Sequence, residues 1–176
     1  MNIFSIILIA ISLSLDAFSL AFSYGLMNLN IKKILFVSFI VGIFHFFMPL
    51  LGLYIGEYIT KTLNINPKLI MFIMFLIVII EMIKSINEEV EQKKLNVIGS
   101  LVFALLVSLD SFSLGIGLYF ITKNLFLAAL IFSISSFLFT LAGFFLGKYV
   151  SLKMEKSSKI IGIIIMFTML LYYLCK

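Results

Sequence analysis

The chain has 176 residues, of which 63% are hydrophobic and only 12% are charged, and its mean hydropathy is +1.25. A soluble domain of this length could not bury so much apolar surface, so the composition excludes that class and predicts an integral membrane protein. All 13 basic residues are lysines and the formal net charge is +5, a surplus that in a membrane protein reflects orientation and anionic lipid rather than nucleic acid.

Six apolar segments are each long enough to cross the hydrocarbon core as a helix, which takes about 20 residues. In chain order they cover residues 2–27, 33–60, 68–86, 97–121, 126–150 and 158–175. We expect the first to be a retained membrane helix, because it lacks the basic region and the cleavage site of a signal peptide. Their continuous apolar character excludes a β-barrel. The predicted fold is an all-α polytopic membrane protein with six transmembrane helices.

Two of these segments contain the pattern Ser-Leu-Asp-small-Phe-Ser-Leu, at residues 14–20 and 108–114. Their aspartates, Asp16 and Asp110, are the only ones in the chain. A carboxylate inside a membrane helix is costly, so its default interpretation is functional. At the helical rise, Asp16 lies ~21 Å from the start of the first helix and Asp110 ~20 Å from the start of the fourth. Measured from opposite membrane faces, both positions fall near the midplane.

The second half of the chain repeats the first. Besides the aspartate segments, residues 51–58 resemble residues 142–149, and both contain a Gly-x-x-x-Gly pair that favours close helix packing. Three crossings per half place the halves in opposite orientations, an inverted-topology repeat that is typical of transporters. We predict one integral membrane domain with a first three-helix repeat (1–86), a cytoplasmic connecting loop (87–96) and a second three-helix repeat (97–176).

The lysines are distributed unequally between the two predicted membrane faces. One face carries Lys32, Lys33, Lys84, Lys93, Lys94, Lys148, Lys153, Lys156 and Lys159. The other carries Lys61, Lys68, Lys123 and Lys176. Because cytoplasmic loops are enriched in basic residues, we expect the first face to be cytoplasmic and both termini to lie outside. The loops after helices one, three and five are then cytoplasmic.

The polar residues near the aspartates are candidate metal ligands. On the first helix a stripe of one helical face contains Ser5, Ser12, Asp16, Ser19 and Ser23. The predicted metal ligands are Asp16, Asp110, Ser19, Ser113, Ser12 and His45. Carboxylate, hydroxyl and carbonyl oxygens suit divalent cations such as Mn²⁺, Mg²⁺ or Ca²⁺. The alternatives are that each serine bonds within its own helix, and that the aspartates are protonated acids joining helices.

Two other polar residues have open interpretations. His45 lies one turn before Pro49, which should kink its helix and free a carbonyl near position 45. The imidazole is either a ligand or proton acceptor, or a donor that joins helices. Glu81 either pairs with Lys84 or faces the core.

The paired aspartate segments and the run Gly-Ile-Phe-His-Phe-Phe-Met-Pro-Leu-Leu-Gly at residues 42–52 resemble the manganese efflux pump family. The resemblance covers essentially the whole chain. It implies export of Mn²⁺ from the bacterial cytoplasm across the plasma membrane by a secondary transporter, with Asp16 and Asp110 as the essential acids. The chain differs from the family at His45, where a glutamate is usual, and at Ala21, where a serine is usual. In these features it is similar to a related group of sporulation membrane proteins.

The leading hypothesis is a divalent-cation exporter, with Mn²⁺ as the favoured ion, in which two repeats rock around a midplane site of two aspartates. The ion is a transported substrate, and no tightly bound cofactor is expected. Nothing resembles a P-loop, so return of protons is the hypothetical driving force. An intramembrane aspartyl protease is disfavoured, because Gly115 and Gly117 follow Asp110 instead of preceding it, and no enzymatic activity is expected. A non-transporting sporulation or structural membrane protein and an exporter of another cation or a small organic solute are the alternatives, and homo-oligomerisation is left open.

Overall fold

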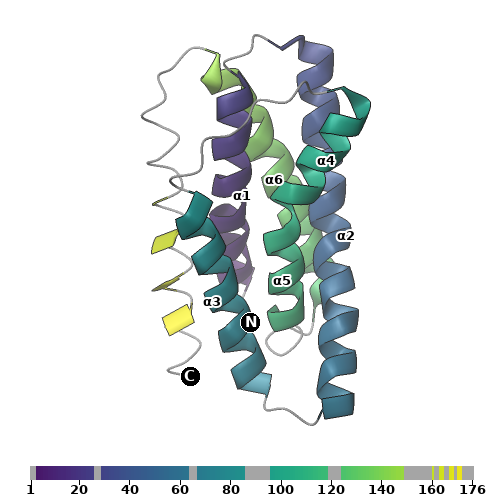
Figure 1. Ribbon diagram of the computed structural model, residues 1–176, viewed down its shortest axis with the longest axis vertical. Helices are drawn as coiled ribbons and strands as arrows, with labels where there is room; N and C mark the ends of the chain where they lie inside the picture. Colours follow the sequence, from purple (N-terminus) through teal and green to yellow (C-terminus); the bar gives the residue numbers. More distant parts are fainter. Residues whose placement is uncertain are drawn as a thin grey trace.

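The fold is a bundle of long helices that run roughly along one axis (Figure 1). The computed structural model describes residues 3–25, 29–63, 67–85, 96–118, 124–148, 160, 163–164, 167–168 and 170–171. Its helices are α1 (Ile3–Gly25), α2 (Ile31–Leu63), α3 (Pro67–Ser85), α4 (Val97–Val107), α5 (Leu109–Leu118) and α6 (Leu125–Gly147). Within these ranges all regular secondary structure is helical, which confirms the predicted all-α class.

Four stretches of the described helices are long and apolar enough to cross a membrane. They are Ile3–Phe22, Ile31–Tyr58, Val97–Leu118 and Leu125–Gly147. The remaining helix, α3, has only 19 residues and includes three charged ones. The predicted sixth span lies mostly outside the described residues, although Leu170 of that segment is buried in a cluster with residues of α1, α3, α5 and α6. The count of six transmembrane helices and the inverted repeat therefore stay predictions.

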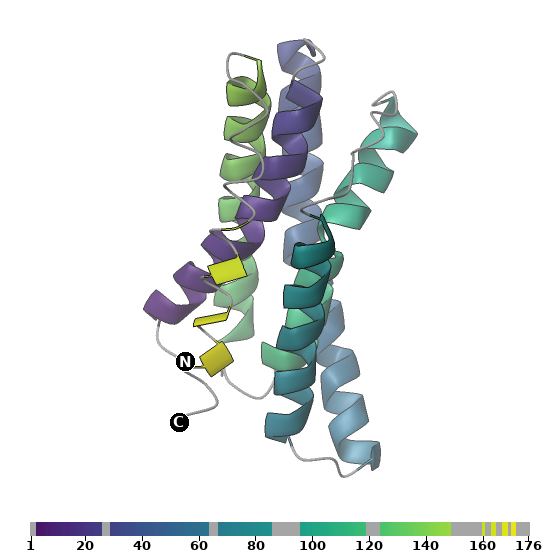
Figure 2. The ribbon, with the colours of Figure 1, turned by 60° about the vertical axis from the view of Figure 1, so that its left-hand side comes forward.

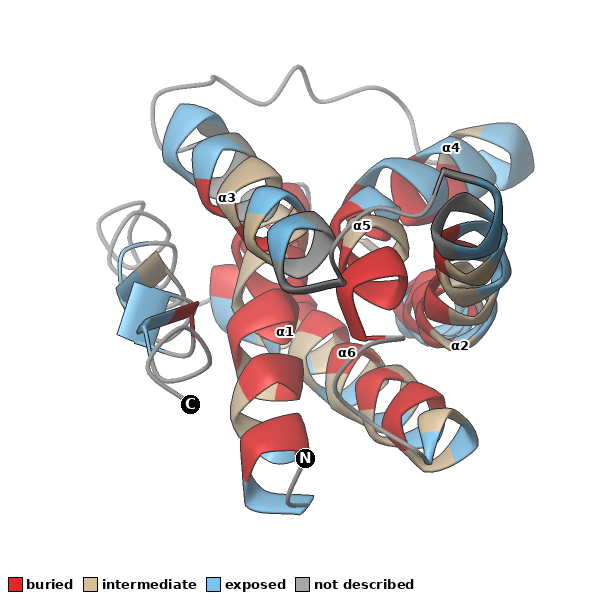
Figure 3. Ribbon diagram, turned by 90° about the horizontal axis from the view of Figure 1, so that it is seen from below, coloured by how far each residue is buried: buried red, intermediate tan, exposed pale blue. Residues whose placement is uncertain are grey.

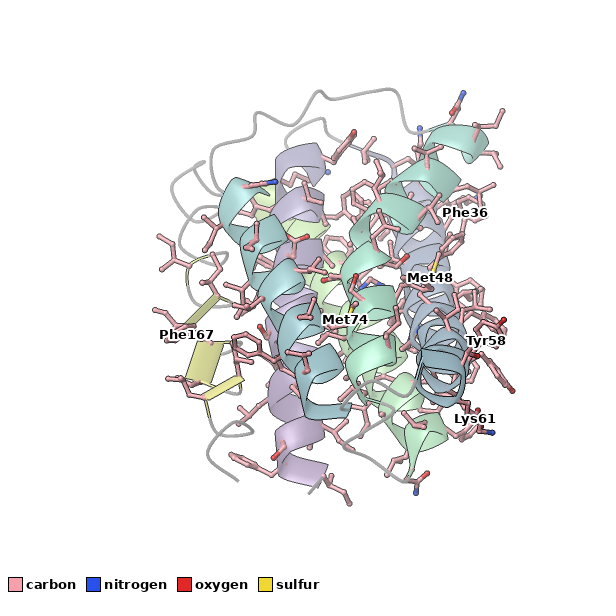
Figure 4. All side chains as sticks on the ribbon, turned by 60° about the horizontal axis from the view of Figure 1, so that its bottom comes forward. Phe36, Met48, Tyr58, Lys61, Met74 and Phe167 are labelled. Carbon is pink, nitrogen blue, oxygen red and sulfur yellow. The ribbon has the colours of Figure 1, made fainter. Side chains whose placement is uncertain are left out.

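The outer faces of the bundle are apolar, as a lipid environment requires. Seen along the bundle, buried positions face inward on every helix, whereas exposed positions lie on the outside of α2, α3 and α4 (Figure 3). Phe36 and Tyr58 project from α2 away from the other helices (Figure 4), and their exposed fractions are 44% and 70%. Large side chains of this kind would be costly in water but are stable against lipid.

Nearly all of the extensive helix packing joins the first half of the chain to the second. Among the described residues, α1 packs mainly on α6, α2 packs on α6, α5 and α4, and α3 packs on α5. No pair of helices within residues 1–86 packs extensively in the part of the chain described. The two halves are therefore interlocked in space.

The glycine pairs form very close backbone contacts, which confirms the prediction of tight packing. A Cβ atom added to Gly143 of α6 would lie 2.5 Å from the carbonyl oxygen of Phe18 of α1. A Cβ atom added to Gly52 of α2 would overlap the carbonyl oxygen of Phe112 of α5. Since only glycine permits such an approach of two backbones, these positions fix both helix pairs.

Both helix pairs run in the same direction along their contact. One turn beyond Gly52, Gly56 lies against Ile116, one turn beyond Phe112. On the other pair, one turn beyond Gly143, Gly147 lies against Phe22. The two pairs thus repeat one packing arrangement, with the aspartate-bearing helix of each half held by the glycine pair of the other half.

The segment predicted over residues 97–121 is a candidate membrane span over Val97–Leu118, but it is not one regular helix, because the chain turns at Ser108 and forms two helices. Ser108 has φ −100° and ψ 2°, and its N–H is shared between the carbonyls of Ala104 and Leu105 at 3.2 Å each. Its hydroxyl also donates to the carbonyl of Leu105 at 3.0 Å. A serine hydroxyl that competes for helical carbonyls bends a helix. As a result α4 leans away from the line of α5 (Figure 2).

The N-terminal cap of α4 gives a first prediction. Asn96 accepts a hydrogen bond from the N–H of Gly99 at 2.7 Å through its side-chain oxygen. We expect Asn96→Ala to destabilise the protein by about 1 kcal/mol, because the N–H loses its acceptor. The apparent unfolding temperature of the detergent-purified protein measures the change. Asn30→Ala is the control, since the side chain of Asn30 reaches the N–H of Lys32 only at 3.4 Å. Equal destabilisation by both variants would contradict the capping role of Asn96.

Candidate metal-binding site

The core of the bundle consists of two separate apolar clusters. The first, called the α3 cluster, contains Ile6, Ile9, Ala10, Leu13, Phe75, Ile79, Leu114, Leu118, Ala128, Phe132 and Leu170. The second, called the α4 cluster, contains Ala17, Ala21, Tyr24, Ile34, Val37, Ile40, Val41, Phe103, Ala104, Val107 and Phe144. Helices α1 and α6 and the α4–α5 segment contribute to both clusters, so each passes through the interval between them.

Both aspartates lie in the interval between the clusters. On α1, the α3 cluster ends at Leu13, the α4 cluster begins at Ala17, and Asp16 lies between the two. On the α4–α5 segment, the α4 cluster ends at Val107 and the α3 cluster begins at Leu114. Asp110 lies between these two residues. The fold thus brings the two predicted acidic residues to the same layer of the bundle.

Buried polar side chains from α6 and α2 lie in or next to this interval. Ser136 and Thr140 of α6 are fully buried. Along α6 they lie between the residues that belong to the α3 cluster and the residue that belongs to the α4 cluster. His45 of α2 is fully buried one turn after Val41. We call this set the polar layer, and its members are Ser14, Asp16, His45, Ser108, Asp110, Ser111, Ser136 and Thr140. Polar groups are costly inside a membrane, so their gathering in the interior indicates a site rather than scattered surface positions.

The break at Ser108 places Asp110 in the first turn of α5. One oxygen of its carboxylate, Oδ1, accepts from the N–H of Ser111 at 2.6 Å and from the Ser111 hydroxyl at 3.3 Å. The side chain is only 7% exposed. A helix N-terminus stabilises negative charge, so the interruption of the helix helps this buried position to hold a carboxylate.

Asp16 has a different local environment. It lies within the unbroken helix α1 and is half-buried. Two residues earlier, the Ser14 hydroxyl donates to the hydroxyl of Ser135 at 2.8 Å and lies 3.2 Å from that of Ser136. This hydroxyl cluster joins α1 to α6 beside the aspartate. The two similar sequence segments therefore have different helix geometry.

The other predicted ligands on the aspartate helices bond within their own helices. The Ser19 hydroxyl donates to the carbonyl of Leu15 at 2.8 Å, and the Ser113 hydroxyl donates to the carbonyl of Leu109 at 3.2 Å. Each hydroxyl oxygen keeps lone pairs that a cation could use, so the role of these serines as ligands stays a prediction. Ser12 is fully buried one turn before Asp16. The side chains of Ser23 and Glu81 lie outside the described part of the structure.

His45 combines burial with one satisfied ring nitrogen. Its Nδ1 lies 3.0 Å from the carbonyl oxygen of Val41, one turn earlier on α2. Its Nε2 has no hydrogen-bond partner among the described residues. Helix α2 continues through Pro49, which has no N–H to donate to the carbonyl of His45. The contact with Val41 accounts for one nitrogen and leaves the function of the other open.

The layer offers mainly oxygen atoms to an ion. In the described ranges, no three His, Cys, Asp or Glu side chains gather closely enough to hold a metal. Any cation in the layer would therefore need hydroxyl or backbone oxygens besides the carboxylates. The sequence prediction missed five members of the layer, which are Ser14, Ser108, Ser111, Ser136 and Thr140. A signal for Ser136 was present, because it precedes Gly143 by seven residues, as His45 precedes Gly52.

Long apolar helices around a buried polar layer are typical of multi-pass membrane transporters. The sequence pattern of the family described as "Putative manganese efflux pump" matches residues 28–174, and the chain belongs to that family. This confirms the resemblance inferred from the aspartate segments. Membership in a family of efflux pumps also favours a transporter over a protease.

Several relatives carry the name "Putative manganese efflux pump MntP". The protein of Bacillus cereus strain AH187 is 30% identical over 174 residues, which cover 96% of this chain and 94% of the relative. The protein of Bacillus pumilus strain SAFR-032 is 30% identical over 145 residues, covering 81% and 79%. The protein of Bacillus thuringiensis subsp. konkukian strain 97-27 is 30% identical over 174 residues, covering 96% and 94%. No solved structure matches the chain.

Proposed function

We propose that the protein exports Mn²⁺ from the cytoplasm by alternating access, with the ion held in the polar layer by Asp16 and Asp110. One observation carries this proposal: the only two aspartates of the chain come from different halves and lie in one layer between the two apolar clusters. The name shared by the relatives supports manganese as the ion and efflux as the direction.

The proposed chemistry follows from charge balance. Two carboxylates neutralise one divalent cation, which lowers the free energy of placing that ion away from water. Hydroxyl oxygens of Ser12, Ser19 and Ser113, which neighbour the polar layer along α1 and α5, complete the proposed coordination together with backbone carbonyls. Oxygen ligands of this kind suit Mn²⁺.

Alternating access requires the layer to open toward each membrane face in turn. The repeated packing of α2 on α5 and of α6 on α1 supports an inverted repeat, in which one arrangement serves both directions. We further propose that the lysine-rich face is cytoplasmic and that protons return as Mn²⁺ leaves. Transport by reconstituted protein that is insensitive to a pH gradient would refute the proton exchange.

The test of the proposed function uses a manganese-sensitive bacterial strain that lacks its own exporter. We expect the wild-type chain to lower cell manganese, measured by mass spectrometry after Mn²⁺ challenge, and to restore growth relative to an empty vector. Parallel challenges with Zn²⁺, Co²⁺ and Mg²⁺ identify the ion. An unchanged cell content of manganese together with a lowered content of another metal would show that the other metal is the substrate. Unchanged content of every metal would favour a non-transporting membrane protein.

A further inference from the structure

His45 is the only histidine of the chain, and its hydrogen bonding fixes which of its two ring nitrogens could bind a metal ion. A carbonyl oxygen only accepts hydrogen bonds, so the 3.0 Å contact with Val41 requires the proton of neutral His45 to be on Nδ1. Nε2 then carries the lone pair. That atom is fully enclosed and has no hydrogen-bond partner among the described residues. A buried acceptor without a partner is unfavourable unless something else binds it.

The packing of α2 on α5 places His45 at the depth of Asp110. A Cβ atom added to Gly115 of α5 would overlap the backbone of Pro49 of α2, and the two helices run in the same direction. His45 lies one turn before Pro49 on α2, and Ser111 lies one turn before Gly115 on α5. Each is therefore about 6 Å from this contact along its helix axis, in the same direction. Ser111 is the residue that donates to the carboxylate of Asp110.

The matching position of the other half is occupied by an oxygen donor. Ser136 precedes the glycine pair of α6 by the same seven residues by which His45 precedes the glycine pair of α2. The Ser136 hydroxyl lies 3.2 Å from that of Ser14, two residues before Asp16. The environment of Asp16 therefore presents hydroxyls where that of Asp110 presents an imidazole.

We propose that Nε2 of His45 is a metal ligand at the Asp110 side of the polar layer, and that this nitrogen makes the protein select transition-metal ions over Mg²⁺ and Ca²⁺. The inference rests on the proposed function, because it assigns specificity within that site. A layer of oxygen atoms alone would suit Mg²⁺ and Ca²⁺ as well as Mn²⁺. Imidazole nitrogen binds first-row transition metals far better than those two ions.

The experiment uses the fact that His45 is the only histidine in the chain. The full-length protein is purified in detergent with a tag that contains no histidine, and Mn²⁺ is added at less than one equivalent. Pulsed electron paramagnetic resonance of the bound Mn²⁺ should show coupling to an imidazole ¹⁴N nucleus. Biosynthetic labelling with ¹⁵N-histidine should replace that coupling by one to ¹⁵N. This labelling test needs no substitution, so it does not depend on a variant that folds.

His45→Asn provides the matched variant. The asparagine amide can still donate to the carbonyl of Val41, but it has no nitrogen atom at the position of Nε2. We expect the nitrogen coupling to be lost and the Mg²⁺ concentration that displaces half of the Mn²⁺ to fall at least about tenfold. Ser38→Ala is the control. It removes a buried hydroxyl of α2 without a partner among the described residues, two turns from His45 and outside the polar layer. It should change neither measurement.

The outcomes separate this inference from the proposed function. Bound Mn²⁺ without coupling to histidine nitrogen, or an unchanged preference over Mg²⁺ in His45→Asn, would overturn the nitrogen ligand and leave the two-aspartate site standing. Failure of the wild-type protein to bind Mn²⁺ would remove the proposed site, and the inference with it.

Discussion

Asp16→Asn and Asp110→Asn should each reduce manganese efflux to the level of an empty vector. Asparagine has nearly the same shape as aspartate but no charge, so each variant leaves a divalent cation with only one carboxylate in a buried layer. An uncompensated charge in such a place costs about 3 kcal/mol or more, which corresponds to a loss of affinity of about 100-fold. Cell manganese after Mn²⁺ challenge measures the effect at matched membrane levels of each variant.

Glu57→Gln is the matched control for these two substitutions. This variant also removes one carboxylate charge. In the wild type, Glu57 pairs with Lys61 at 2.8 Å on an exposed turn of α2, away from the polar layer. Exposed pairs of this kind contribute less than about 1 kcal/mol. Glu57→Gln should therefore export manganese as the wild type does. Normal efflux by either asparagine variant would exclude a site that needs both aspartates.

Gly52→Val and Gly143→Val should prevent the correct assembly of the bundle. At both positions even a Cβ atom would meet the carbonyl oxygen of the facing helix, Phe112 or Phe18. A backbone oxygen cannot rotate away as a side chain can, so the helices must separate and lose the packing beyond the contact. Overpacking of well-packed cores costs about 1–3 kcal/mol, and separated backbones raise this further. We expect loss of the monodisperse peak in fluorescence-detected size-exclusion chromatography.

Two controls distinguish backbone contact from a general intolerance of substitution. Ala142 is the exposed neighbour of Gly143, so Ala142→Val adds volume to the same turn without meeting another helix. Gly42→Ala is intermediate, because its Cβ would lie 3.2 Å from the Phe137 Cβ and 3.3 Å from the Ser133 carbonyl oxygen. The loss of the monodisperse peak should be largest for Gly143→Val, smaller for Gly42→Ala and smallest for Ala142→Val. Equal profiles for Gly143→Val and Ala142→Val would contradict the role of the glycine contact.

The sequence was sufficient to predict those features that depend on residue type at a repeated position. The two aspartate segments and the two glycine pairs are such features, since a buried carboxylate and a missing Cβ each have one dominant physical consequence. The apolar segments also predicted the helices, although α2 extends further at both ends than the predicted residues 33–60. The length of an apolar segment does not define where a helix ends. The ends depend on capping and on contacts with the loops.

The break at Ser108 and the contact of Ser14 with Ser136 could not be predicted. No glycine or proline lies near Ser108, and the same Ser-Leu-Asp pattern continues as regular helix around Asp16. Tertiary packing therefore decides which copy bends. The contact of Ser14 with Ser136 joins residues 122 positions apart, between helices that are apolar on almost every face. Such helices carry little periodic pattern that could indicate which face meets which neighbour.

The interlocked packing of the two halves also determines when the protein can complete its fold during synthesis. Helices α1 and α2 leave the ribosome first, but their glycine-mediated partners are α6 and α5. Until those helices are made, the first half must remain in the bilayer with its carboxylate and histidine unshielded from lipid. A nascent chain of residues 1–86 thus lacks the helix contacts that complete the fold. Completion of the fold depends on the second half of the chain reaching the membrane.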